Sequence, residues 1–176
     1  MDTKMLIETM SGNDIDHSKR RALELLLEGG RVKILINNAV ADLIRPEHLS
    51  GDHFALNLSW QFHNNMELED AGVWAEPSFA GRAYSCFIPW SAIFGIVEDP
   101  EEKPTTGSQH VIHFPGSMPP AILASFMVHV PEDRQNHHIH LEVFPWVSAS
   151  EEAKAKVQVS KTGVRPVFGV IKGGKS

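Results

Sequence analysis

Residues 54–60 read Phe-Ala-Leu-Asn-Leu-Ser-Trp, and this short stretch decides the class of fold. Phe54, Leu56, Leu58 and Trp60 alternate with small or polar residues. A period of two is typical of a β-strand with one buried face. The stretch therefore predicts a strand that covers an apolar core.

The segments that follow predict further short strands. Glu69-Asp-Ala-Gly72 indicates a turn, 73–79 a returning strand, and Ala80-Gly81 a break. Residues 84–88 predict another strand, which ends at Pro89 because proline cannot donate to a strand ladder. Strands in sequence joined by tight turns predict a meander that closes or half-closes into a small barrel or sandwich.

A leucine-rich helix is predicted ahead of this meander. Asn13 or Asp14 can cap its start, and Gly29-Gly30 can end it. Its apolar face is wide, which suits either a core helix or a helix shared with a second copy of the chain. Residues 32–36 then predict a strand.

Composition limits the classes of function. The chain has 176 residues, 42% of them apolar, and a net charge of −6, which opposes non-specific binding of nucleic acid. Cys86 is the only cysteine, so no disulfide forms within the chain, and we expect a buried core thiol in a reducing cytoplasm. With no signal peptide and no apolar run near the ~20 residues that span a bilayer, we expect a soluble, cytoplasmic protein without membrane contact.

The distribution of proline, glycine and charged residues along the sequence predicts that the chain divides into five segments. We expect a frayed N-terminus at 1–12, a folded domain at 13–98, and a linker at 99–110 that ends the core domain. Residues 111–160 form an extension that either folds onto the core or makes its own unit. Residues 161–176 form a tail with a short apolar motif, typical of a recognition element.

Ten histidines raise a metal hypothesis. His138 and His140 are two residues apart, so a strand would direct both to one face, and zinc and iron sites use such pairs. Other candidate ligands are His110, His113, His129 and Glu142. A metal-dependent enzyme or sensor therefore stays open beside the simpler interpretation of surface histidines.

Other chemistry has little support in the sequence. There is no nucleophile-elbow motif, no phosphate-binding glycine loop and no zinc-protease motif. Glu67, Glu69 and Asp70 lie at a predicted turn, where acidic residues are common. The aromatic residues of the meander could stack RNA bases, but the acidic balance opposes this, and most of the rings are expected in the core. We expect no enzyme activity and no cofactor.

Six segments, taken together, resemble a known family. They are 21–29 (RALELLLEG), 44–48 (IRPEH), 53–59 (HFALNLS), 65–69 (NMELE), 79–81 (FAG) and 88–96 (IPWSAIFGI). In order and spacing they resemble the stringent starvation protein B family, bacterial adaptors of the ClpXP protease, over residues 18–98. A second match lies in the tail, which is similar to the family's ClpX-docking peptide at Arg165, Pro166, Val167, Phe168, Val170, Ile171 and Lys172.

The resemblance implies an α+β fold in which the helix packs on a partly open, Sm-like barrel. It implies an adaptor that binds ssrA-type degradation tags on substrate proteins and docks to the ClpX unfoldase. The tag groove would involve Ile44, Pro46, Leu58, Trp60, Phe79, Ala80, Gly81 and Tyr84. A homodimer would form through Leu23, Leu26 and Leu27. The sequence departs from the family at Gly169, which replaces a basic residue, and in the four residues after Lys172.

Overall fold

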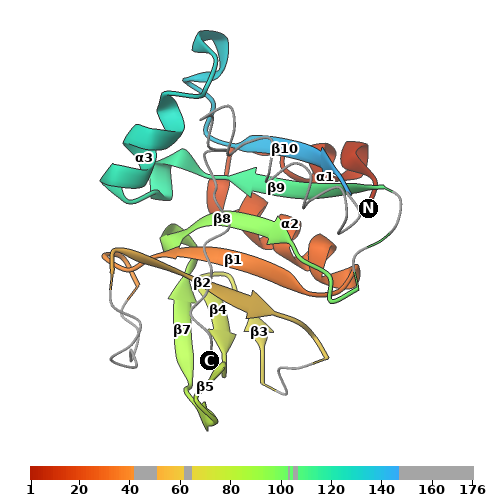
Figure 1. Cartoon of the computed structure of the whole chain (residues 1–176), viewed down its shortest axis with the longest axis vertical. Helices are drawn as coiled ribbons and strands as arrows, with labels where there is room; N and C mark the ends of the chain where they lie inside the picture. The colour runs from red at the N-terminus through yellow and green to blue at the C-terminus, as the bar shows by residue number, and fades with distance from the viewer. Residues whose placement is uncertain (42–50, 62–64, 103, 105–106, 147–176) are drawn as a thin grey trace, which may run out of the picture.

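The computed structural model describes residues 1–41, 51–61, 65–102, 104 and 107–146. These residues confirm the α+β class: three helices accompany an antiparallel five-stranded sheet and two smaller sheets (Figure 1). The described strands do not form a closed barrel. The helices are α1 (Thr3–Thr9), α2 (Ile15–Glu28) and α3 (Pro120–Met127), with 3-10 turns η1 (Trp90–Ala92), η2 (Pro115–Ser117) and η3 (Glu132–Arg134).

The large sheet has the strand order β10-β9-β8-β1-β2, and all its pairs are antiparallel. A second sheet has the order β3-β4-β7, and β5 pairs with β6. The strands are β1 (Val32–Asn37), β2 (His53–Leu58), β3 (Glu67–Leu68), β4 (Gly72–Ala75), β5 (Ser78–Phe79), β6 (Arg82–Ala83), β7 (Cys86–Pro89), β8 (Ile93–Glu98), β9 (Ser108–His113) and β10 (His140–Pro145).

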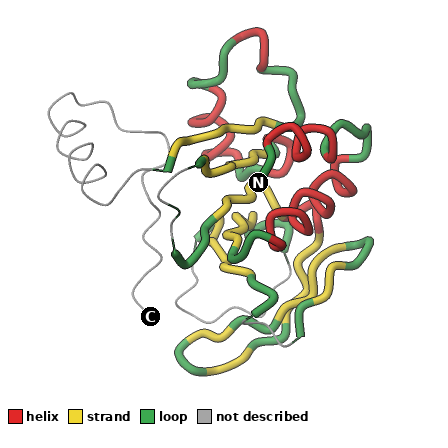
Figure 2. Tube along the Cα trace, turned by 90° about the vertical axis from the view of Figure 1, so that its right-hand side faces the viewer, coloured by secondary structure: helices red, strands yellow, loops and turns green. Residues whose placement is uncertain are grey.

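Helix α2 forms where its caps predict. The Asp14 carboxylate accepts a hydrogen bond from the backbone N–H of His17 at 3.2 Å, and Gly30 takes a φ of +131° just beyond the helix. Figure 2 shows the two N-terminal helices, beside the N mark, side by side along one face of the strands. The expectation of a frayed N-terminus is wrong, because Leu6 of α1 is fully buried and Met10 is 7% exposed.

The three leucines expected at a dimer interface belong to the chain's own core. Leu23, Leu26 and Leu27 are at most 2% exposed. They pack with residues of β1, β2 and β8 in the main apolar cluster. A second copy of the chain cannot contact these side chains while α2 holds this position, so a dimer would have to use other residues.

The strand predicted first is present, with two differences. Leu56 and Leu58 point into the core as the alternation predicts, but β2 ends at Leu58, and Trp60 lies beyond it with 48% of its surface exposed. The single return strand predicted for 73–79 is two strands, β4 and β5, with Pro77 between them. Proline has no N–H for the ladder, which accounts for the interruption.

The large sheet continues past the predicted linker at 99–110. Strand β9 pairs with β8, and β10 pairs with β9, so residues 108–146 extend the same sheet instead of forming a separate unit. The Glu98 carboxylate accepts a hydrogen bond from the backbone N–H of His110 at 3.1 Å and joins the two sides of this connection. The core domain therefore does not end at residue 98.

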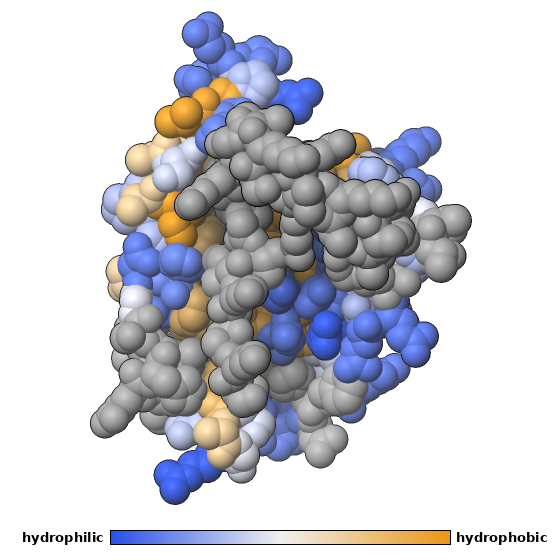
Figure 3. Space-filling view, viewed as in Figure 1, coloured by the Kyte–Doolittle hydropathy of each residue, from blue (hydrophilic) through white to orange (hydrophobic). Residues whose placement is uncertain are grey.

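Helix α3 covers part of the second face of the large sheet. Leu35 and Phe94 point to this face, opposite to their strand neighbours, and pack with Met118 and Phe126. Val128, just after α3, is 79% exposed, and Figure 3 shows apolar side chains gathered over α3. None of the helices in the described part of the chain has the length and apolar character needed to cross a bilayer.

Candidate functional site

The hairpin β5–β6 carries the best-described part of the predicted tag groove. Phe79 pairs with Arg82, so Ala80 and Gly81 are the two residues of the turn. Their φ angles are +50° and +78°, and positive φ at both positions is typical of a type I′ hairpin turn. The two small residues therefore serve the turn itself, and they bring the hairpin tip out into solvent, where both are exposed.

Two aromatic side chains meet at the base of this hairpin. The ring centroids of Phe79 and Tyr84 are 5.8 Å apart, and both residues are half-buried. The backbone N–H of Tyr84 donates to the oxygen of Pro77 at 3.0 Å, which fixes the ring pair relative to β4. A half-buried aromatic pair offers apolar surface to a bound chain without any rearrangement of the core.

The remaining groove residues divide into three groups. Leu58 is fully buried, so its side chain supports the core and cannot contact a ligand directly. Trp60 is exposed at the end of β2. Ile44 and Pro46 lie outside the described residues, as do the docking residues from Arg165 to Lys172.

A concavity that the sequence did not predict lies on the outer face of the β3–β4–β7 sheet. Trp74 of β4 stands in a row between Glu67 of β3 and Phe87 of β7, and its ring lies 5.1 Å from that of Phe87. The concavity has a volume of about 260 Å³. Its lining residues are Asn65, Glu67, Glu69, Trp74, Ala75, Glu76 and Ser85.

The lining of the concavity is acidic. Glu76 accepts a hydrogen bond from the side-chain nitrogen of Asn65 at 2.8 Å. Within the described ranges, no ion pair involves Glu67 or Glu69, and no Lys or Arg lines the hollow. Trp74 is 41% exposed here, although its strand neighbours Val73 and Ala75 are buried. Successive side chains of a strand point to opposite faces, so the position of Trp74 between two buried residues could have indicated that its side chain faces outward.

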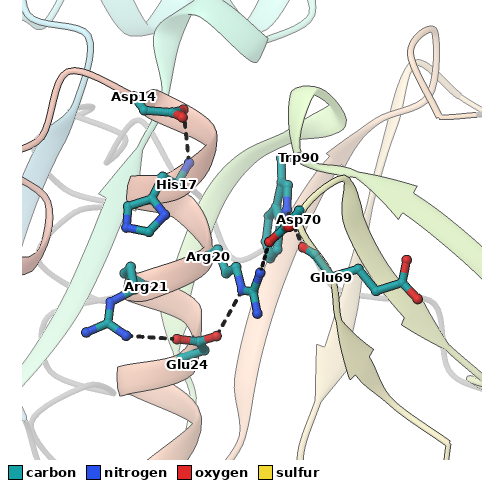
Figure 4. A network of polar contacts seen from close by, with 8 residues as sticks. All are labelled: Asp14, His17, Arg20, Arg21, Glu24, Glu69, Asp70 and Trp90. Atoms are coloured by element: carbon teal, nitrogen blue, oxygen red, sulfur yellow. Dashed lines mark hydrogen bonds and ion pairs between the residues drawn. The ribbon is translucent and has the colours of Figure 1, made fainter.

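One wall of the concavity is tied to α2 (Figure 4). Arg20 donates to Glu24 at 3.0 Å and also to Asp70, while the indole N–H of Trp90 donates to the backbone oxygen of Glu69 at 3.0 Å. Figure 4 shows the Glu69 side chain extending away from the Arg20–Asp70 pair. The Arg20 guanidinium is thus paired with Glu24 and Asp70 and not with Glu69, whose backbone is held by the hydrogen bond from Trp90.

The histidines proposed as metal ligands have other partners. His110 Nδ1 lies 2.9 Å from the Glu98 carboxylate and its Nε2 lies 2.9 Å from the Thr3 hydroxyl. His113 Nε2 lies 3.0 Å from the Glu142 carboxylate. This hydrogen bond holds the pKa of Glu142 below its usual value, whereas burial lowers the pKa of His140.

His129 and His138, the two other candidates, are exposed. No group of three metal-binding side chains lies close enough to hold an ion in the described part of the chain. Among the described residues, the fold therefore does not bring the candidate metal ligands together into one site.

Cys86 is a core thiol, as predicted. It is 8% exposed, and burial raises its pKa to about 11. A thiol with such a pKa stays protonated near neutral pH and is a poor nucleophile.

Neither the family models nor the curated proteins give a match to this chain.

Proposed function

We propose that the protein is a non-enzymatic adaptor that binds ssrA-type degradation tags and delivers the tagged proteins to the ClpXP protease. The observation that carries this proposal is the ordered set of six segments that resemble the stringent starvation protein B family. The described parts of these segments lie on α2, β2, β3, β5 and the run from β7 through η1 to β8.

The tag would bind as an extended peptide beside the β5–β6 hairpin. The Phe79–Tyr84 pair supports this placement because it presents apolar surface at the edge of a short sheet. An extended chain gains main-chain hydrogen bonds at such an edge, and shallow pockets select alternate side chains. In this proposal the large sheet and the β3–β4–β7 sheet are the two halves of a partly open, Sm-like barrel, with Trp60 at its rim.

The tail and a second copy complete the proposed mechanism. Residues 165–172 would dock to ClpX, and a homodimer would present two such tails to one hexameric unfoldase. Linking two weak sites raises the apparent affinity by ~10²–10⁴ when the linkers span the distance. No covalent step is needed, because the adaptor only raises the local concentration of the substrate in the cytoplasm while ClpX hydrolyses ATP.

A truncation separates the two binding functions. Deletion of residues 164–176 should abolish capture of ClpX in a pull-down, while the anisotropy of a fluorescent tag peptide still reports binding at the affinity of the full chain. A truncated protein that stimulates degradation of tagged substrates as well as the full chain would show that the tail assignment is wrong. A full chain that does not raise the anisotropy would refute tag binding.

A further inference from the structure

The acidic concavity beside Trp74 has features that an ordinary solvent-facing sheet surface lacks. A Trp that is 41% exposed in the middle of a strand keeps a large apolar ring in water. The ring lies in a hollow of about 260 Å³ with three carboxylates around it, and no Lys or Arg among the described residues lines it. Acidic residues alone are common on surfaces, but here they surround an exposed indole in a concave site.

The carboxylates approach the hollow from different parts of the small sheet. Glu67 lies on β3, Glu69 in the turn after it, and Glu76 just beyond β4. Gathered negative charges repel one another, and a bound cation relieves this repulsion. The hollow is therefore electrostatically suited to a positive ligand.

The spread of the carboxylates indicates which kind of cation fits. In the described ranges they do not form a group that could hold a metal ion. A guanidinium group has five N–H donors in a rigid plane, so it can reach carboxylates from several directions. It also stacks on aromatic faces, and Trp is the best of the aromatic residues for a cation–π contact.

We infer that this concavity binds an arginine side chain of a partner peptide, with Trp74 as its aromatic wall and Glu67 and Glu69 as its acceptors. Asn65 already donates to one oxygen of Glu76 at 2.8 Å, so we assign the guanidinium contacts to Glu67 and Glu69, which have no ion pair in the described part of the chain. This inference does not depend on the adaptor function, because it concerns a cationic side chain and not a degradation tag.

The test uses the full chain labelled with ¹⁵N and the probe acetyl-Ala-Arg-Ala-amide. We expect the indole N–H resonance of Trp74, assigned by comparison with Trp74→Phe, to shift in a saturable manner. The matched peptide with citrulline in place of arginine has almost the same shape but no charge. We expect no shift with it at the same concentrations.

Paired variants separate a local contact from the overall charge. The exposed double variant Glu67→Gln/Glu69→Gln should weaken binding at least about threefold, the scale of partly screened charge pairs. Glu102→Gln/Glu132→Gln removes the same charge from exposed positions outside the lining and should leave the affinity unchanged. Amide spectra that match the parent elsewhere establish that each variant is folded.

Four results would overturn the inference. They are the absence of any saturable shift with the arginine peptide, an equal shift with the citrulline peptide, an equal loss of affinity in the control double variant, and displacement of the peptide by Mg²⁺ at matched ionic strength. The last result would replace an arginine site with a metal site. Because the probe has no tag sequence, none of these results bears on tag binding.

Discussion

The side-chain nitrogen of Lys19 lies 2.7 Å from the backbone oxygen of Trp90 and 2.8 Å from the hydroxyl of Ser117. Lys19 is only 1% exposed, and its nitrogen also lies 5.2 Å from the ring centre of Phe114. One lysine on α2 thereby joins η1, which immediately precedes β8, and η2, which follows β9. The N-terminal helix and the C-terminal part of the sheet are held together through this buried polar group.

The first prediction concerns the pH dependence of stability. Burial lowers the pKa of Lys19 to about 8. Above pH 8 the folded chain releases the Lys19 proton, while the unfolded chain keeps it up to about pH 10.5. Because the unfolded state then binds more protons, Lys19 makes the free energy of unfolding increase as the pH rises. Urea unfolding should show a gain of roughly 1 kcal/mol from Lys19 between pH 7 and pH 9.

Lys19→Met removes this titration and serves as the comparison. The buried Cys86 thiol, with its pKa raised to about 11, works in the opposite direction near pH 9, but it does so equally in both proteins. The difference between the two proteins therefore isolates Lys19. The same pH dependence in both would show that the buried lysine does not titrate in this range.

The second prediction concerns close packing in the β4–β7 pair. A Cβ atom at Gly72 would lie 2.3 Å from the backbone oxygen of Ile88 and 2.8 Å from Cα of Pro89. Because backbone atoms cannot move aside locally, Gly72→Ala should lower the free energy of unfolding by about 3 kcal/mol. Gly116→Ala is the control, since no atom lies within 4 Å of its added Cβ. Equal stability of the two variants would contradict the close approach of β4 to β7.

The third prediction concerns the turn of the β5–β6 hairpin. Gly81 has a φ of +78°, a conformation that costs an L-residue about 1 kcal/mol, so Gly81→Ala should destabilise the hairpin. Ala80→Gly should have the opposite effect, because Ala80 itself has a φ of +50°. Hydrogen exchange of the Tyr84 amide, bonded to Pro77 across the base of the hairpin, reports the change. Slower exchange in Gly81→Ala would rule out this turn.

The fourth prediction concerns the Glu142–His113 pair. The hydrogen bond from His113 lowers the pKa of Glu142, so its stabilising effect is complete above the carboxyl's unfolded pKa and is lost as pH falls through the folded pKa. Because the Glu142 side chain is 45% exposed, Glu142→Gln should cost less than about 1 kcal/mol at pH 7.

Substitution of His113 provides the direct measurement for this pair. In His113→Phe an aromatic ring remains to pack against Phe126, whose ring lies 5.1 Å from that of His113. Carbon-detected NMR titration should then place the pKa of Glu142 closer to its ordinary value. An unchanged pKa would mean that another group lowers it.

Local signals predicted the first half of the fold well. Capping residues placed α2, and the alternation from Phe54 to Leu58 placed β2 with the correct face inward. These patterns depend on neighbours in the sequence. Short-range sterics also explain why Pro77 divides the expected return strand.

The second half was harder to predict because its strands depend on distant partners. Strand β10 pairs with β9 only after an intervening segment that includes α3, and His140 reaches His113 across 26 intervening residues of loop and helix. Prolines and apolar patches there suggest irregular structure, and no local pattern specifies the pairing. The wide apolar face of α2 likewise could not show whether its leucines pack against the chain's own sheet or against a second copy of the chain.

The candidate site shows the same division. The turn at Ala80-Gly81 is a local feature, and the sequence indicated a break there. The concavity at Trp74 arises from a row of residues on three strands, and only the assembled sheet places Glu67 and Phe87 on either side of the indole. Strand pairing, which the sequence pattern left open, creates that site.

We propose that the folded domain binds a degradation tag as an extended chain, and an amide NMR titration would detect that binding residue by residue. Labelled full-length protein is titrated with an ssrA-type tag peptide and, separately, with the same residues in scrambled order. We expect saturable shifts for the amides of Phe79 to Tyr84 and Trp60 with the tag peptide alone. Amides that stay unchanged throughout 44–84, or that respond equally to the scrambled peptide, would contradict it.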